Sequence, residues 1–156
     1  MRTNQSFAPS ISLILKRISD DKALVLLNSI AVVDGEKYIQ LKRMNLSTKQ
    51  YYSRISGLAD AGLIKRHKGK YSLTMLGHVV YDSQMIIGKT LAYYWKLKVI
   101  ESVEMSTPSG LPNDEITQLI SALIDNHRIK NILVKSISSS TENLHTENNS
   151  DNNVET

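Results

Sequence analysis

The stretch from Asn45 to Leu73 constrains the fold more than any other part of the chain. It reads NLSTKQYYSRISGLADAGLIKRHKGKYSL. A hydroxyl of Ser47 or Thr48 would cap a helix at its start, and Gly62 supplies the left-handed residue that ends one. Three apolar residues recur at the spacing of one helix face: Tyr51, Ile55 and Leu58. The stretch therefore predicts a helix over 48–61 with one buried face.

A β-hairpin is expected directly after this helix. Residues 63–65 read as a first strand and 71–73 as its return, with Lys68-Gly69-Lys70 between them. Lysines around a glycine make a tip that is positively charged and exposed. The predicted fold class is mainly α with one small antiparallel β-hairpin, a winged helix-turn-helix whose wing spans 65–73.

Basic residues are concentrated on the same stretch. The 156-residue chain carries a net charge of +4, but residues 35–70 hold nine Lys or Arg and two acids, which gives +7. The segment from 138 to the end holds four acids and no Lys or Arg. A charge run is often only a solvated surface, but here the charges coincide with the helix and the hairpin. Basic charge gathered on one motif favours a polyanionic partner.

Several classes of function find no support in the sequence. There is no cysteine, which excludes disulfides and thiolate metal sites. No run of eighteen apolar residues predicts a membrane span, and the N-terminus lacks the order of a signal peptide, so a cytoplasmic protein is expected. The histidines are scattered, and no nucleophile, phosphate-loop or dinucleotide motif is found. We expect a protein that is not an enzyme and has no metal and no cofactor.

The rest of the chain divides into further segments. The helix–hairpin motif is preceded by a helix that starts at Ser19 and ends near Val32, and by a short helix that ends near Met44. The last residues are too polar to offset the cost of ordering them. The expected organisation is an N-terminal arm (1–18), the winged helix-turn-helix (19–74), a long helix (75–106), C-terminal helices (107–137) and a disordered acidic tail (138–156).

The long segment 75–106 has more apolar residues than one small domain can cover. Its weak points are Gly77 and Gly88, and the first strong stop is Thr107-Pro108. A long helix with an uncovered apolar surface is typical of a dimer contact. We therefore expect a homodimer formed largely by this helix. The alternative is a bend near Gly88, after which the C-terminal helices would cover the apolar surface.

The helix face opposite the apolar one carries side chains that suit DNA. Gln50 can pair with adenine, and Arg54 or Lys49 with guanine, in the major groove. Thr48 and Ser53 suit phosphate contacts, while Tyr52 would offer its hydroxyl to a phosphate. The predicted DNA-binding residues are Thr48, Lys49, Gln50, Tyr52, Ser53, Arg54, Arg66, His67, Lys68 and Lys70. Lys68 and Lys70 would contact the minor groove or the backbone, and Arg66 and His67 would support them.

The residues KQYYSRISGLADAGLIKR, followed by KGKYSLTMLG, resemble the winged helix-turn-helix of MarR- and ArsR-type transcription regulators. The resemblance is greatest to small archaeal winged-helix proteins and covers about residues 19–100. It implies a homodimer on pseudo-palindromic double-stranded DNA, with recognition helices about one DNA turn apart. The absence of cysteine departs from relatives that sense thiols or metals.

Three functions follow as hypotheses. The favoured one is a sequence-specific double-stranded DNA-binding transcription regulator. The second is a winged-helix protein-interaction or signalling module whose basic face is incidental. The third is a sensor in which a ligand or phospho-relay partner, of a kind the residues do not identify, binds the C-terminal helices and changes the affinity for DNA.

Overall fold

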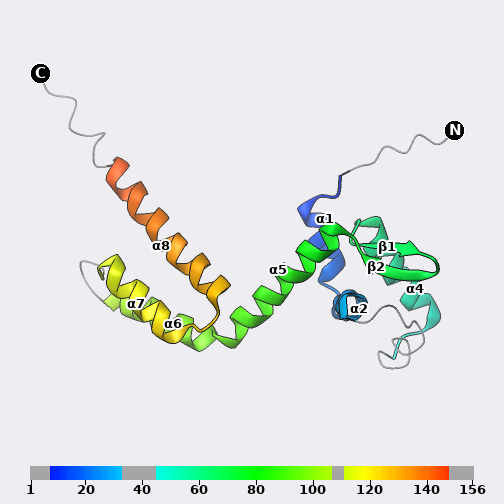
Figure 1. Cartoon of the computed structure of the whole chain (residues 1–156), viewed down its shortest axis with the longest axis horizontal. Coiled ribbons are helices and arrows are strands. Elements are labelled where there is room, and N and C mark those ends of the chain that lie inside the picture. Colours follow the sequence, from blue (N-terminus) through cyan, green and yellow to red (C-terminus); the bar gives the residue numbers. More distant parts are fainter. Residues whose placement is uncertain (1–7, 33–44, 107–110, 148–156) are drawn as a thin grey trace, which may run out of the picture. The chain divides into compact units, whose positions relative to one another are not determined.

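The computed structural model describes residues 8–32, 45–106 and 111–147 (Figure 1). Within these residues the chain forms seven helices and one two-stranded antiparallel hairpin, which confirms the predicted fold class. The elements are α1 (Ile11–Ile18), α2 (Asp21–Val32), α4 (Thr48–Asp60), β1 (Ile64–His67), β2 (Lys70–Leu73), α5 (Met75–Ala92), α6 (Tyr94–Ser106), α7 (Asn113–Leu123) and α8 (His127–Glu147). Contacts divide the chain into two compact units, Met1–Gln84 and Met85–Thr156.

The core of the first unit is formed by α2, α4 and the hairpin. The three apolar residues predicted on one face of the α4 helix are all buried. The largest side chains in this core that are almost fully buried are Leu26, Leu27, Tyr51, Leu58 and Leu63. Burying a side chain of this size stabilises the fold by about 1.5–3 kcal/mol. This core therefore fixes which face of α4 remains outside.

Helix α4 starts and ends close to the predicted bounds. The Ser47 hydroxyl accepts a hydrogen bond from the backbone N–H of Gln50 at 3.2 Å, and the Gln50 side-chain oxygen accepts one from the N–H of Ser47 at 3.1 Å. This reciprocal pair is a capping box, which satisfies two backbone donors at once. At the other end Gly62 has φ of 71°, the left-handed conformation expected of it.

Two other predicted helices precede α4. Helix α2 begins at Asp21, two residues after Ser19, and the Asp20 carboxylate accepts a hydrogen bond from the N–H of Ala23 at 2.8 Å. Helix α1 lies within the predicted N-terminal arm, is capped by Ser10, and packs against α2 and α4. The predicted short helix that ends near Met44 lies outside the described residues.

The start of α5 is held against the hairpin. The Thr74 hydroxyl accepts a hydrogen bond from the N–H of Gly77 at 2.9 Å and donates one to the carbonyl of Gly62. A Cβ at position 77 would lie 1.9 Å from the carbonyl oxygen of Leu63. Gly77 is therefore the residue that lets α5 approach the backbone before β1.

The predicted long helix 75–106 is interrupted at Tyr93, whereas Gly88 lies within α5. The N–H of Tyr93 donates to the carbonyl of Thr90 at 2.9 Å, a bond to the residue three positions back. The Thr90 hydroxyl in turn donates to the carbonyl of Ile86 at 2.9 Å. Such side-chain bonds to the preceding turn often bend helices, which gives a physical reason for the break.

The second unit is built on a core of isoleucines from α6, α7 and α8. The predicted apolar stripe of α7 contributes to this core. Its buried residues are Ile100, Ile116, Ile120, Ile124 and Ile129. Lys96 of α6 donates from Nζ to the carbonyl of Leu123 at 2.7 Å, where α7 ends. Asn126 caps α8 by accepting from two backbone N–H groups of its first turn.

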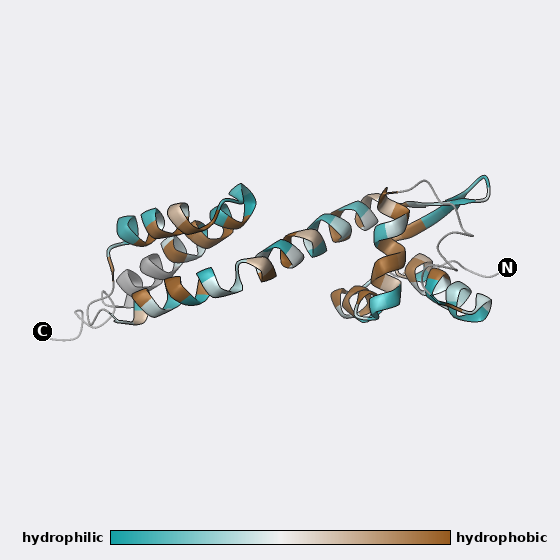
Figure 2. Cartoon of the chain, turned by 90° about the horizontal axis from the view of Figure 1, so that it is seen from below, coloured by the Kyte–Doolittle hydropathy of each residue, from teal (hydrophilic) through white to brown (hydrophobic). Residues whose placement is uncertain are grey.

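Helix α8 extends to Glu147, beyond residue 137, where the C-terminal helices were predicted to end. Ser138 and Ser139 donate their hydroxyl hydrogens to carbonyls one turn earlier, so these polar groups are satisfied inside the helix. Figure 2 shows hydrophobic and hydrophilic residues alternating along α5 and a hydrophilic tip on the hairpin. In the described ranges, no helix is both long enough and apolar enough to cross a membrane.

Candidate nucleic-acid interface

The hairpin turns through two residues, Lys68 and Gly69. Their φ values are 47° and 83°, so both central residues of the turn are left-handed, as in the hairpin turns that match strand twist. Lys70 belongs to β2 and pairs with His67. Lysine seldom adopts positive φ, whereas asparagine and glycine do so readily. The tip therefore holds a cation at a position where it costs stability.

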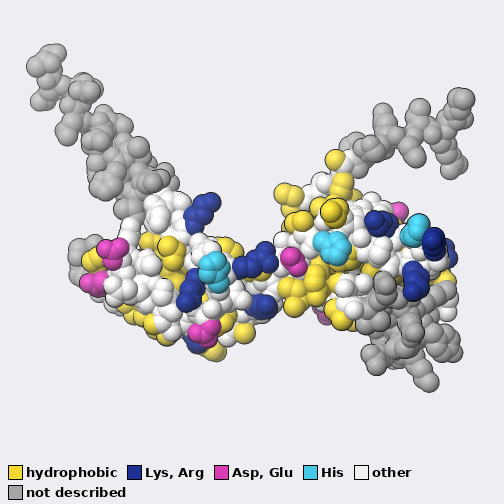
Figure 3. Space-filling view, in the orientation of Figure 1, with side chains coloured by type: hydrophobic (Ala, Val, Ile, Leu, Met, Phe, Trp, Pro, Cys, Tyr) yellow, Lys and Arg dark blue, Asp and Glu magenta, His cyan; other side chains and the backbone are white. Residues whose placement is uncertain are grey.

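The strand register separates the basic side chains onto two faces. Residues that pair across an antiparallel ladder share a face, and alternate residues share one along a strand. Lys65, His67 and Lys70 therefore lie together on the face away from the core, and all three are exposed. Figure 3 shows Lys, Arg and His side chains gathered over the end of this unit that holds the hairpin.

Arg66 lies on the opposite, core-side face of the hairpin. It pairs with Tyr71 across the ladder, and its guanidinium carbon stands 5.8 Å from the centre of that ring. Tyr71 is half-buried against the first core. Arg66 is thus occupied by a cation–π contact, whereas Lys65 joins the outer face. Lys65 was missed as a site residue, although strand alternation from His67 would have found it.

The exposed face of α4 carries most of the predicted recognition residues. Thr48, Lys49 and Ser53 are exposed, as is Tyr52, a residue that is 43% accessible. The Tyr52 ring meets the buried ring of Tyr51 edge-on, with centroids 5.4 Å apart. This contact orients a large aromatic side chain on the outer surface of the helix.

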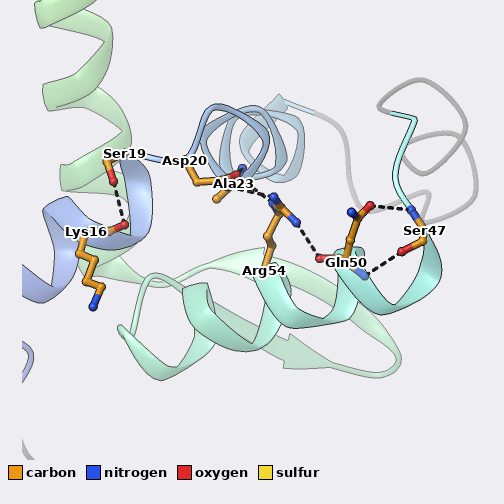
Figure 4. A network of polar contacts seen from close by, with 7 residues as sticks. All are labelled: Lys16, Ser19, Asp20, Ala23, Ser47, Gln50 and Arg54. Carbon is orange, nitrogen blue, oxygen red and sulfur yellow. Dashed lines mark hydrogen bonds and ion pairs between the residues drawn. The ribbon is translucent and has the colours of Figure 1, made fainter.

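Arg54 is bound within the protein, in contrast to its predicted place on the free outer face. Its Nε lies 2.8 Å from Oδ1 of Asp20 and its Nη2 lies 2.9 Å from Oδ2, while Nη1 donates to the carbonyl of Gln50 at 3.3 Å (Figure 4). The hydrogen bond from Arg54, with a smaller one from the backbone, lowers the pKa of the Asp20 carboxyl. The same hydrogen bond raises the pKa of Arg54. Arg54 therefore ties α4 to the start of α2.

Gln50 also has an internal role. Its side-chain oxygen accepts the capping-box hydrogen bond from Ser47. A two-point contact with adenine uses both the oxygen and the nitrogen of a glutamine side chain. Gln50 could make that contact only if the cap opened. The sequence Ser47-x-x-Gln50 is the signal that would have assigned this role in advance.

Taken together, the first unit has two exposed surfaces. One is the outer face of α4, and the other is the outer face of the hairpin, which follows α4 along the chain. The structure brings Lys65, His67, Lys68 and Lys70 together, and keeps Arg54 and Gln50 engaged internally. Over the residues described, no group of three or more His, Asp or Glu side chains could hold a metal ion. Comparison with protein-family models, curated proteins and solved structures found no match to this chain.

Proposed function

We propose that the protein binds double-stranded DNA as a transcription regulator, with α4 in the major groove and the hairpin on the backbone or minor groove. The observation that carries the proposal is the outer hairpin face, where Lys65, His67 and Lys70 are aligned and Lys68 forms the tip. Clustered exposed cations bind phosphate by releasing condensed counterions from DNA. The order of helix and hairpin is consistent with a winged helix, and the resemblance to MarR- and ArsR-type regulators supports this assignment.

Base reading in this proposal falls to the exposed residues of α4. Lys49 is the side chain on this face best suited to guanine, whose acceptors lie in the major groove. Thr48, Tyr52 and Ser53 would contact phosphates or the edges of neighbouring bases. With Arg54 and Gln50 held internally, the proposal assigns more of the affinity to phosphate contacts than to base contacts.

We also propose that the DNA-bound form is a homodimer. An apolar stripe remains exposed in the second unit, along the last part of α5 and along α6. It consists of Ile87, Leu91, Trp95, Val99 and Val103, which follow one another at intervals of four residues. Exposed apolar residues that recur in this way are typical of a protein–protein contact. Twofold pairing would present two copies of α4 to the two halves of a palindromic site.

Selection of bound duplexes from random DNA tests the proposal directly. We expect an enriched motif with twofold symmetry. Lys49→Ala should relax the preference at one position of each half-site, because it removes one base-edge contact. Lys89→Ala, a change on α5 outside the proposed interface, is the matched control. An absence of enrichment would reject sequence-specific recognition by α4.

The salt dependence of duplex binding tests the hairpin separately. Lys68→Asn removes one charge from the tip, and asparagine followed by glycine is a preferred pair for this turn. We expect the slope of log affinity against log salt to fall by about one, with no loss of thermal stability. If the chain does not bind duplex at low salt, the alternative of a protein-interaction module is favoured. The internal engagement of Arg54 and Gln50 is the observation that keeps this alternative open.

A further inference from the structure

A cavity of about 230 Å³ lies between α1, the start of α2 and the middle of α4. Its volume is below the roughly 300–1,000 Å³ of pockets that enclose drug-sized ligands, so it suits a small group. The residues that decide its chemistry are Lys16, Arg17, Asp20, Ser53, Arg54 and Gly57. Two of them, Ser53 and Arg54, belong to the helix that carries the proposed recognition face.

The cavity is positively charged. Its lining contains three cations, Lys16, Arg17 and Arg54, and one acid, Asp20, so the formal sum is 3 − 1 = +2. Arg54 and Asp20 satisfy one another through two short contacts. Asp20 is the one acid in this lining and is paired with Arg54, and among the described residues the Nε of Arg17 has no hydrogen-bond partner. Figure 4 shows Lys16 extending from α1 with its ammonium apart from the other side chains drawn.

Arg17 is held in an arrangement that calls for an acceptor. Among the described residues, its Nε is buried and has no hydrogen-bond partner. Buried donors are rarely left unpaired, because losing water without a replacement is unfavourable. The side chain crosses α4 at Gly57, where an added Cβ would stand 3.2 Å from Nη1 and 3.3 Å from Cδ. The glycine therefore leaves the space in which this guanidinium lies.

We propose that this cavity binds a phosphate group through Arg17 and Lys16, with the Ser53 hydroxyl as a neutral donor. Arginine matches the oxygens of phosphate with a rigid fork of donors. Donors placed on α1 and α4 suit an anion that accepts from several directions.

The phosphate has two sources, the DNA backbone or a free phosphate-bearing molecule. The first rests on the proposed function, since Ser53 lies on the exposed face of α4 and would place the cavity at the edge of the groove. A backbone phosphate held there would fix how deeply α4 enters, as phosphate contacts fix position without reading sequence.

The test uses the full-length chain with three variants and two probes. Arg17→Gln removes the charged donor, and Gly57→Ala fills its space without changing charge. Lys89→Gln, outside the cavity, controls for net charge. The probes are inorganic phosphate at constant ionic strength and a duplex of mixed sequence. The readouts are the N–H resonance of Arg17 Nε and the affinity for each probe.

We expect at least one probe to shift the Arg17 resonance in a saturable way. Arg17→Gln and Gly57→Ala should each weaken the binding of that probe about tenfold. Lys89→Gln should have a much smaller effect. A shift with inorganic phosphate identifies a free ligand, and a shift with duplex alone identifies the backbone. Alanine favours a helix interior over glycine, so a melting curve for Gly57→Ala that is not lowered shows that weaker binding is not unfolding.

No shift with either probe, or equal weakening in the control, would overturn the inference. Duplex binding that leaves the Arg17 resonance unchanged, in a chain where inorganic phosphate also causes no shift, would overturn the inference while leaving the proposed function standing. A phosphate shift in a chain that does not bind duplex would support the cavity and reject the proposed function.

Discussion

At the scale of single residues, Asp20 has two roles at the junction of α1, α2 and α4. Its Oδ1 accepts from the backbone of Ala23 and from Arg54, while its Oδ2 accepts a second bond from the same guanidinium. Two-point contacts between arginine and a carboxylate are among the stronger polar interactions. The side chains of Arg54 and Asp20 are 23% and 45% exposed, so solvent screening keeps the stabilisation modest. The pair controls the availability of Arg54 more than the stability of the fold.

Asp20→Asn should release Arg54 without removing the helix cap, because asparagine caps helices as well as aspartate does. We expect a stability loss below about 1 kcal/mol, measured by urea unfolding at neutral pH. Duplex affinity should rise, since a freed guanidinium on α4 can reach DNA. Asp60→Asn removes the same charge from α4 without releasing a cation. Equal tightening in both variants would mean that net charge alone matters.

The stability difference between the wild type and Asp20→Asn should also depend on pH. The pKa of Asp20 in the folded protein is lowered, first by the hydrogen bond from Arg54. Its contribution is therefore present above the unfolded pKa, which is about 3.9, and is lost as pH falls through the folded value. Unfolding curves should converge in acid and separate towards neutral pH. A difference that persists unchanged in acid would point to the cap instead.

At the scale of elements, the two glycines of α5 have opposite roles. Gly77 lies against the backbone of Leu63, whereas a Cβ at Gly88 would meet nothing within 4 Å. Glycine weakens a helix interior in general, so only a close approach justifies its presence. From the sequence, both glycines are predicted to be weak points of one helix, because spacing along the chain does not show what packs against them.

Gly77→Ala should destabilise the first unit by about 1–3 kcal/mol or more, because the new methyl must displace the backbone at Leu63. Gly88→Ala should stabilise the chain by about 0.5–1 kcal/mol through helix propensity alone. Chemical unfolding followed by helical circular dichroism measures both. If the two substitutions shift stability in the same direction, the close approach at Gly77 is not a packing constraint.

Local signals predicted local structure well. The bounds of α4, its buried face and the hairpin follow from caps, spacing and a glycine, all of which act over a few residues. The break at Tyr93 lies beside a hydrogen bond from the Thr90 hydroxyl to the carbonyl of Ile86, and no proline or glycine at the break signals it in the sequence. The pairing of Arg54 with Asp20 joins residues 34 positions apart, so helix phase alone could not show that Arg54 has a partner within the protein.

At the scale of the whole molecule, the chain consists of two units that each have a core of their own. The first holds the candidate nucleic-acid interface. The second buries one side of α6 against α7 and α8 but leaves Trp95 77% exposed and Leu91 67% exposed. Single exposed apolar residues are ordinary, but a large aromatic within an apolar stripe is not. This stripe is the surface that we propose for the contact between two copies of the chain.

Trp95→Glu should convert a dimer into a monomer, because it places a charge in the centre of the proposed contact. Met105→Glu is the matched control, since this α6 residue is 86% exposed but lies outside the stripe. Sedimentation at micromolar concentration should show a dimer for the wild type and the control, and a monomer for Trp95→Glu. The monomer should still bind single half-sites, with reduced affinity for a palindrome, because the first unit carries the proposed DNA-binding residues. A wild-type monomer, or equal dissociation in both variants, would contradict a contact through this stripe.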